Sequence, residues 1–129
     1  MYQFGTEVKG SFDNVVDHTI AALKAEGFGV LVDIDIQATL KEKLNVDKQP
    51  YRILGACNPP LANQALEAEP DIGLLLPCNV VVRQLEGGGV RVAFMDPSAV
   101  LTLVNRPEVK SLAEEVRGKL QKVLKALEG

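Results

Sequence analysis

The chain has 129 residues, of which 47% are hydrophobic and 24% are charged, and this composition is typical of a folded globular protein and not of a disordered one. A chain of this length buries about two-thirds of its unfolded surface, which is enough for a core that needs no cross-link. The formal net charge of -3 excludes a long-range electrostatic attraction to nucleic acid or anionic lipid. The N-terminus shows no basic and apolar leader, and no apolar run approaches the length of a bilayer span. We therefore expect a cytoplasmic protein without nucleic-acid or membrane partners.

No repeat, low-complexity tract or linker interrupts the chain, so we expect one domain over residues 1–129. Residues 2–8 alternate weakly between apolar and polar side chains and predict a first strand. Ser11 can cap a following helix that ends at Gly27. Residues 28–34 are rich in Val and Ile and predict a second strand, after which Asp35 can cap a short helix.

The middle of the chain predicts two further strands. Residues 51–57 predict a buried strand, and Asn58 can cap a helix that extends to about residue 68. Residues 72–84 are mostly apolar and predict one long strand, which is bent at Pro77 because proline lacks a backbone N–H.

Three consecutive glycines at residues 87–89 predict the turn of a β-hairpin, whose second strand places Val90, Val92 and Phe94 in the core. Asp96 can open a short helical turn before a final helix that begins near Asn105. Apolar residues recur along this helix at helical spacing and predict one buried stripe, made by Val109, Leu112, Ala113, Val116, Leu120, Val123 and Leu127.

This order of elements mixes hairpin pairing with crossovers, which predicts a layered α+β domain and not a regular Rossmann alternation. The glycine cluster lies between two strands and not between a strand and a helix, so it does not predict a dinucleotide or phosphate loop.

The two cysteines both precede an asparagine, in the pairs Cys57-Asn58 and Cys78-Asn79. Thiols at such positions can form a disulfide, share a soft metal, present a reactive thiolate or pack as small hydrophobic side chains. Cys57 precedes a predicted helix N-terminus, whose dipole favours a thiolate, whereas Cys78 is a candidate resolving thiol or second ligand. A buried packing role is favoured for Cys57, because free cysteines are commonly buried and inert.

Other polar residues have structural and functional interpretations. Asn58 is a standard helix cap, and its amide can also bind an anion. Asn79 interrupts an apolar strand and needs a bulge, a backbone partner or a ligand. Arg52 within a strand must reach solvent, pair with an acid or hold an anion. His18 projects from the polar side of its helix, and a solvated role is favoured over a Cys-His dyad. Two cysteines without a CxxC spacing or a histidine cluster assign no metal site, and no cofactor is identified.

Five segments carry a resemblance to a known family: residues 25–30, 38–44, 50–59, 72–80 and 95–97. These segments, and above all the two Cys-Asn pairs, are similar to the family catalogued as domain of unknown function 302. The resemblance implies an α+β fold likened to one repeat of the TATA-box-binding protein, with an antiparallel sheet covered by helices and usually assembled as a homodimer. The likeness concerns shape alone and implies no DNA binding for this mildly acidic chain. The family has no agreed activity, so the resemblance assigns no catalytic residue.

Three hypotheses of function follow. The first is a cytoplasmic homodimer that binds a small polar ligand or a soft metal near Cys57, Asn58, Cys78 and Asn79, with Arg52 as a further candidate. The second is a thiol redox enzyme, in which Cys57 attacks a disulfide, sulfur or peroxide substrate and Cys78 resolves the adduct. The third is a purely structural homodimeric module that associates through the final helix.

Overall fold

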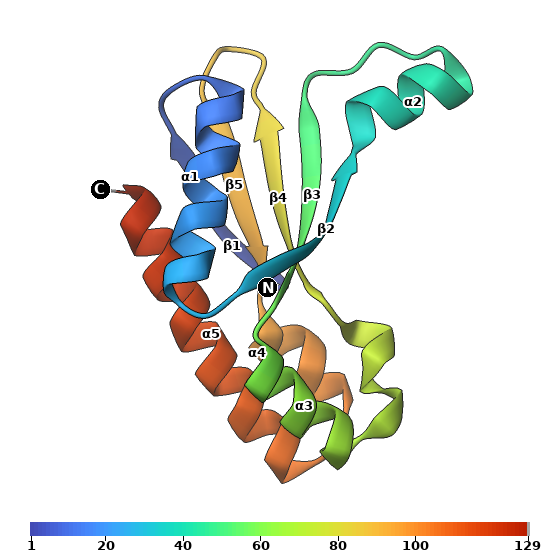
Figure 1. Cartoon of the computed structure of the whole chain (residues 1–129), viewed down its shortest axis with the longest axis vertical. Helices are drawn as coiled ribbons and strands as arrows, with labels where there is room; N and C mark the ends of the chain where they lie inside the picture. The colour runs from blue at the N-terminus through green and yellow to red at the C-terminus, as the bar shows by residue number, and fades with distance from the viewer. Residues whose placement is uncertain (129) are drawn as a thin grey trace.

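The computed structural model describes residues 1–128 and contains one five-stranded antiparallel sheet with strand order β1-β5-β4-β3-β2 (Figure 1). The strands are β1 (Gln3–Val8), β2 (Gly29–Asp35), β3 (Tyr51–Cys57), β4 (Cys78–Gln84) and β5 (Val90–Met95). The helices are α1 (Phe12–Ala25), α2 (Ile36–Leu44), α3 (Pro59–Ala68), α4 (Pro97–Val100) and α5 (Pro107–Glu128), and two 3-10 helices are η1 (Pro70–Leu75) and η2 (Leu101–Leu103). The predicted α+β class is confirmed.

The polar residues expected to cap helices do so. The Asn14 backbone N–H donates to Ser11 Oγ at 3.2 Å at the start of α1. The Ala38 backbone N–H donates to Asp35 Oδ1 at 2.8 Å at the start of α2. These bonds satisfy backbone donors that have no partner within the helix, which fixes where each helix begins.

Asp96 caps α4 and also attaches α5 to the end of the sheet. Its Oδ1 accepts from the Ser98 backbone N–H at 2.9 Å. The Arg117 Nε–H donates to both carboxylate oxygens, at 3.2 Å and 3.1 Å. The Arg117 guanidinium also lies 5.6 Å from the ring centroid of Phe4 in β1. Because Arg117 is in the middle of α5, these contacts fix the position of the helix along the sheet.

The core lies between one face of the sheet and the two helices α1 and α5, and α1 crosses in front of β1 and β5 in Figure 1. Alternate residues of the hairpin strands face this core and are completely buried: Val80, Val82, Val90, Val92 and Phe94. All seven residues of the predicted stripe on α5 are buried as well. The 3.6-residue period of α5 and the two-residue period of β4 and β5 therefore identified the faces that meet.

The prediction of one long strand over residues 72–84 is wrong in its first part. Residues 70–75 form η1, which contacts α3, and β4 begins only at Cys78. Pro70 occupies the start of the 3-10 helix, where its missing N–H has no consequence. Ile72 is buried and Leu75 and Leu76 pack against the core, while Leu74 is 88% exposed, so the apolar run does not follow the alternation of a strand.

The opposite face of the sheet carries an apolar row that crosses all five strands. The row is formed by residues paired in register, namely Ile34, Ile53, Val81, Ala93 and Gly5. Alternation places these side chains away from the core, and Ile34 is 40% exposed. At the β2 edge, α2 extends from the sheet and buries none of its own residues (Figure 1).

Within residues 1–128, no helix is both long enough and apolar enough to cross a membrane.

Candidate functional site

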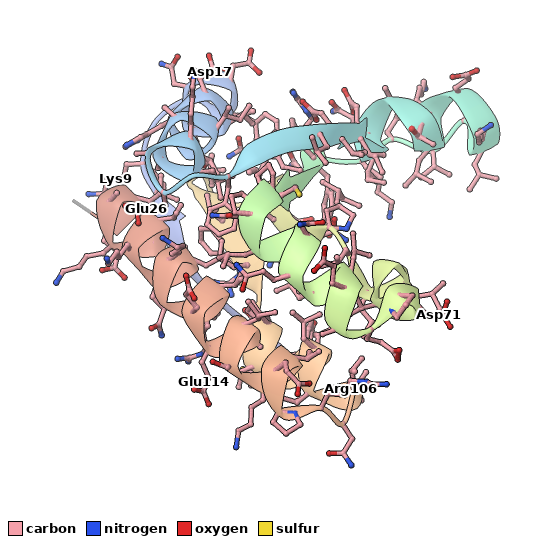
Figure 2. All side chains as sticks on the ribbon, turned by 60° about the horizontal axis from the view of Figure 1, so that its bottom comes forward. Lys9, Asp17, Glu26, Asp71, Arg106 and Glu114 are labelled. Atoms are coloured by element: carbon pink, nitrogen blue, oxygen red, sulfur yellow. The ribbon has the colours of Figure 1, made fainter. Side chains whose placement is uncertain are left out.

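A pocket of about 280 Å³ lies where α3, η1 and α5 meet the ends of β3 and β4. In Figure 2, α3 runs beside α5 and below β2, and the pocket lies among the side chains of these elements. Its walls are formed by Phe28, Leu31, Ala56, Cys57, Asn58, Leu61, Ala62, Ala65, Leu66, Gly73, Leu76, Pro77, Cys78, Leu101, Leu112 and Val116. None of these residues is charged, and Asn58 is the one amide among them. The pocket is therefore a hydrophobic site that contains both thiols of the protein.

Cys57 and Asn58 are positioned by the junction between β3 and α3. Cys57 is the last residue of β3 and is half-buried. The Asn58 Oδ1 accepts from the Leu61 backbone N–H at 3.4 Å, so Asn58 caps α3 as predicted. The Asn58 Nδ2 lies 3.0 Å from the position that a Cβ would occupy on Gly27, whose φ is +86°. The amide is thus packed between two chain segments, which leaves it little freedom to recognise a ligand.

Cys78 is the first residue of β4, and its side chain is on the covered face of the sheet. It is 5% exposed. Its Cα pairs with that of Ala56, so Cys78 is one residue out of register with Cys57. Burial, together with a smaller contribution from the nearby Cys57, raises the pKa of the Cys78 thiol from 9.0 to about 11. Cys78 is therefore a neutral thiol at pH 7.

Asn79 and Arg52 lie outside this pocket. Asn79 follows Cys78 in β4, so it points to the uncovered face of the sheet, where it is exposed. Arg52 is near the other end of β3, about 17 Å along the strand from Cys57. Its Nε–H donates to Asp33 Oδ1 at 2.7 Å, and its second guanidinium nitrogen contacts the other carboxylate oxygen. This hydrogen bonding lowers the pKa of Asp33. The structure thus groups three of the five candidate residues and separates the other two.

The comparisons with known proteins identify the family. The model of the domain of unknown function DUF302 matches residues 4–127. The chain belongs to the DUF302 family. It is also similar to a solved structure titled "Crystal structure of uncharacterized conserved protein DUF302 from Bacillus stearothermophilus". The two chains share 29% sequence identity with a TM-score of 0.90, and the alignment covers 98% of each chain. No curated protein matches this chain.

A second hollow of this DUF302 protein is larger but has a different character. A groove of about 880 Å³ lies between α2, the loop that follows it and the β4–β5 turn. Exposed charged residues of both signs line it, including Asp47, Lys48 and Glu86, and none of its lining residues is buried. A site that removes a ligand from water needs buried walls, so the smaller pocket is the better candidate.

Few side chains of this DUF302 protein are placed to bind a metal ion together. Residues 1–128 hold no cluster of three or more His, Cys, Asp and Glu side chains that could bind an ion. The candidate pocket offers two thiols and one capping amide. His18 is exposed on α1, as predicted, and is not among the residues that line the pocket.

Most of the pocket residues were not identified from the sequence. Leu61, Ala62 and Ala65 come from α3, and Leu112 and Val116 come from α5, where the apolar period indicated only a core contact. A usable signal was present in α3, because two alanines lie at positions that face the sheet and α5. Small side chains at facing positions leave space that larger ones would fill.

Proposed function

We propose that this DUF302 protein binds a small, largely apolar molecule in the pocket between α3, α5 and the ends of β3 and β4. The observation that carries this proposal is the lining of the pocket, which is alkyl, aromatic and thiol apart from Asn58. The chemistry of these walls favours an apolar ligand over the polar one expected from the sequence, because a buried polar group needs hydrogen-bond partners.

The volume supports a ligand of modest size. An apolar cavity of about 150 Å³ is large enough to bind benzene, and this pocket has about 280 Å³. A single aromatic ring with a short substituent, or a short alkyl chain, fits that range. Leu31 is 68% exposed and Leu66 is 41% exposed, so part of the pocket lining is in contact with solvent.

The test is the binding of fluorobenzene, followed by ¹⁹F NMR saturation transfer. We expect binding to the wild-type protein and about a tenfold loss of affinity in Ala62→Leu, because the added carbons occupy the half-buried α3 wall of the pocket. Ala21→Leu is the matched control, since Ala21 is exposed on α1 and does not line the pocket. Equal binding by the two variants, or no binding by the wild type, would refute the proposal.

We also propose that the protein forms a homodimer through the uncovered face of its sheet. The apolar row of Ile34, Ile53, Val81, Ala93 and Gly5 supports this. Ile34 is exposed and the other four residues are half-buried, and a contiguous apolar surface is typical of protein interfaces. In light scattering after gel filtration we expect a dimer for the wild type and for an Ala21→Lys control, and a monomer for Ile34→Lys. A monomeric wild type would contradict the proposal.

The five antiparallel strands with helices on one face support the likeness to one repeat of the TATA-box-binding protein. The proposal concerns shape and not DNA, because the net charge is -3. The two free thiols suit a reducing compartment and support a cytoplasmic location.

A further inference from the structure

The two thiols of the pocket have different environments, and this difference indicates what class of ligand the pocket takes. Cys57 is half-buried at the end of β3 and is one of the residues that line the pocket. Cys78 is 5% exposed. The pocket lining therefore contains one half-buried cysteine and one cysteine that is shielded from water.

This difference determines which cysteine reacts first. The thiolate is the nucleophile in sulfur chemistry. Because burial raises the pKa of Cys78 to about 11, roughly one Cys78 side chain in ten thousand is ionised at pH 7. Attack on a ligand therefore falls to Cys57.

We propose that Cys57 holds a small apolar sulfur compound in this pocket as a covalent mixed disulfide, formed by exchange with an apolar disulfide, while Cys78 stays a thiol. This inference rests on the proposed function, since it identifies the ligand class of the same pocket. It makes the protein a carrier of a sulfur-linked group and not a dithiol reductase.

The exchange balances without a further reactant. The Cys57 thiolate attacks one sulfur of the disulfide R–S–S–R, so that the bond from Cys57 Sγ to that sulfur forms and the S–S bond of the ligand breaks. The departing thiolate takes up the proton that the Cys57 thiol released. The protein sulfur is oxidised to the disulfide level, and one half of the ligand is reduced to a thiol.

The position of Cys78 explains why the adduct persists. Resolution would need the Cys78 thiolate to attack the Cys57 sulfur. The residue directly opposite Cys78 in the ladder is Ala56 and not Cys57, so the two cysteines are offset by one residue. Low ionisation and the one-residue offset together make that second attack slow.

The walls also select the group that is carried. Leu61, Leu112 and Val116 contact a ligand through alkyl groups, and no lysine, arginine, aspartate or glutamate lines the pocket. A charged disulfide would lose its hydration without gaining a partner. An aryl or short alkyl sulfide is the class that fits.

The experiment uses 2,2′-dithiodipyridine, an apolar aromatic disulfide that releases the chromophore thiopyridone when it reacts. We expect the reduced wild-type protein to release one equivalent, and peptide mapping by mass spectrometry to locate the thiopyridyl group on Cys57. The comparator is the dianion 5,5′-dithiobis(2-nitrobenzoate), with each rate divided by that of N-acetylcysteine. We expect about a tenfold preference for the apolar reagent and about a tenfold slower reaction in Ala62→Leu. Ala21→Leu is the control and should react like the wild type.

Three results would overturn the inference. The first is release of two equivalents with formation of a Cys57–Cys78 disulfide, which would show a dithiol enzyme. The second is reaction at Cys57 that the Ala62→Leu substitution leaves unchanged, which would show that the pocket takes no part. The third is the absence of an adduct. In that case, fluorobenzene binding to the wild type separates the two proposals: retained binding refutes only the covalent step, and lost binding refutes the apolar pocket as well.

Discussion

The burial of Cys78 predicts a loss of stability at alkaline pH that can be calculated from the structure. The pKa of its thiol is raised from 9.0 to about 11, mainly because burial disfavours the thiolate. The unfolded chain therefore releases this proton at lower pH than the folded protein does. Between these values the unfolded state binds fewer protons, so the free energy of unfolding falls as the pH rises. The stabilisation is fully present below pH 9 and is lost progressively toward pH 11.

The magnitude follows from the same two pKa values. At pH 10 the thiol is mostly ionised in the unfolded chain and mostly protonated in the folded protein, which amounts to about 1.4 kcal/mol. We therefore expect the difference in unfolding free energy between the wild type and Cys78→Ala to shift by about this amount from pH 7 to pH 10, against the wild type.

The assay is urea denaturation followed by circular dichroism, with reductant present, at pH 7, 8, 9 and 10. Taking the difference between two variants cancels the contribution of every titratable group that both variants contain. Val80→Ala is the matched control, because Val80 is buried on the same face of β4 and carries no titratable group. Its cost should not depend on pH. If the wild-type and Cys78→Ala curves stay parallel up to pH 10, Cys78 is not shielded from water, and the inferred difference between the two thiols fails.

Two backbone features predict further effects on stability, each measurable by urea denaturation. Gly55→Ala should destabilise the protein by about 1–3 kcal/mol, because the added Cβ would lie 2.8 Å from Pro77 Cγ. Gly29→Ala in β2 is the control, because a Cβ there meets open space, and it should change the free energy of unfolding little. Equal losses of stability in the two variants would contradict the packing of Pro77 on β3. Asn58→Ala should lower the free energy of unfolding by about 0.5–2 kcal/mol, because α3 loses its cap. Asn63→Ala is the control, since Asn63 is exposed on the same helix. A loss of stability no larger than that of the control would show that the cap contributes nothing.

Local signals in the sequence were sufficient for most of the fold. The caps Ser11, Asp35 and Asn58 act on backbone donors within three residues, so their effect does not depend on tertiary structure. The stripe on α5 follows from the period of one helix, and all of its members are buried. Such features can be recognised without knowing what the element packs against.

The error at residues 70–75 shows where local reasoning ends. A short apolar run is compatible with a strand and with a helical turn, and composition does not distinguish them. The choice was made by packing, because Ile72 reaches the core while η1 contacts α3. Pro70 at the first position was a signal for a helical start that the apolar run outweighed in the prediction.

The candidate site could be predicted only in part, for a related reason. The period of two residues along β4 was sufficient to separate Cys78 from Asn79, because Val80 and Val82 on the same face are core residues. The presence of Cys57 and Cys78 in the lining of one pocket depends on the pairing of Ala56 with Cys78. That pairing joins residues that are 22 apart in the chain, and no local pattern in the sequence predicts it.

The side chains that line the pocket favour a role in ligand binding. Elsewhere in the core, large side chains such as Phe94, Leu54 and Leu120 are completely buried. Around the pocket, Ala62 and Ala65 lie where larger apolar side chains would complete the packing. Protein interiors are normally packed as densely as organic crystals, and space left unfilled lowers stability. Both cysteines of the chain line that unfilled space. Stability alone does not account for small side chains and two thiols around one cavity, whereas a sulfur-linked apolar ligand accounts for both.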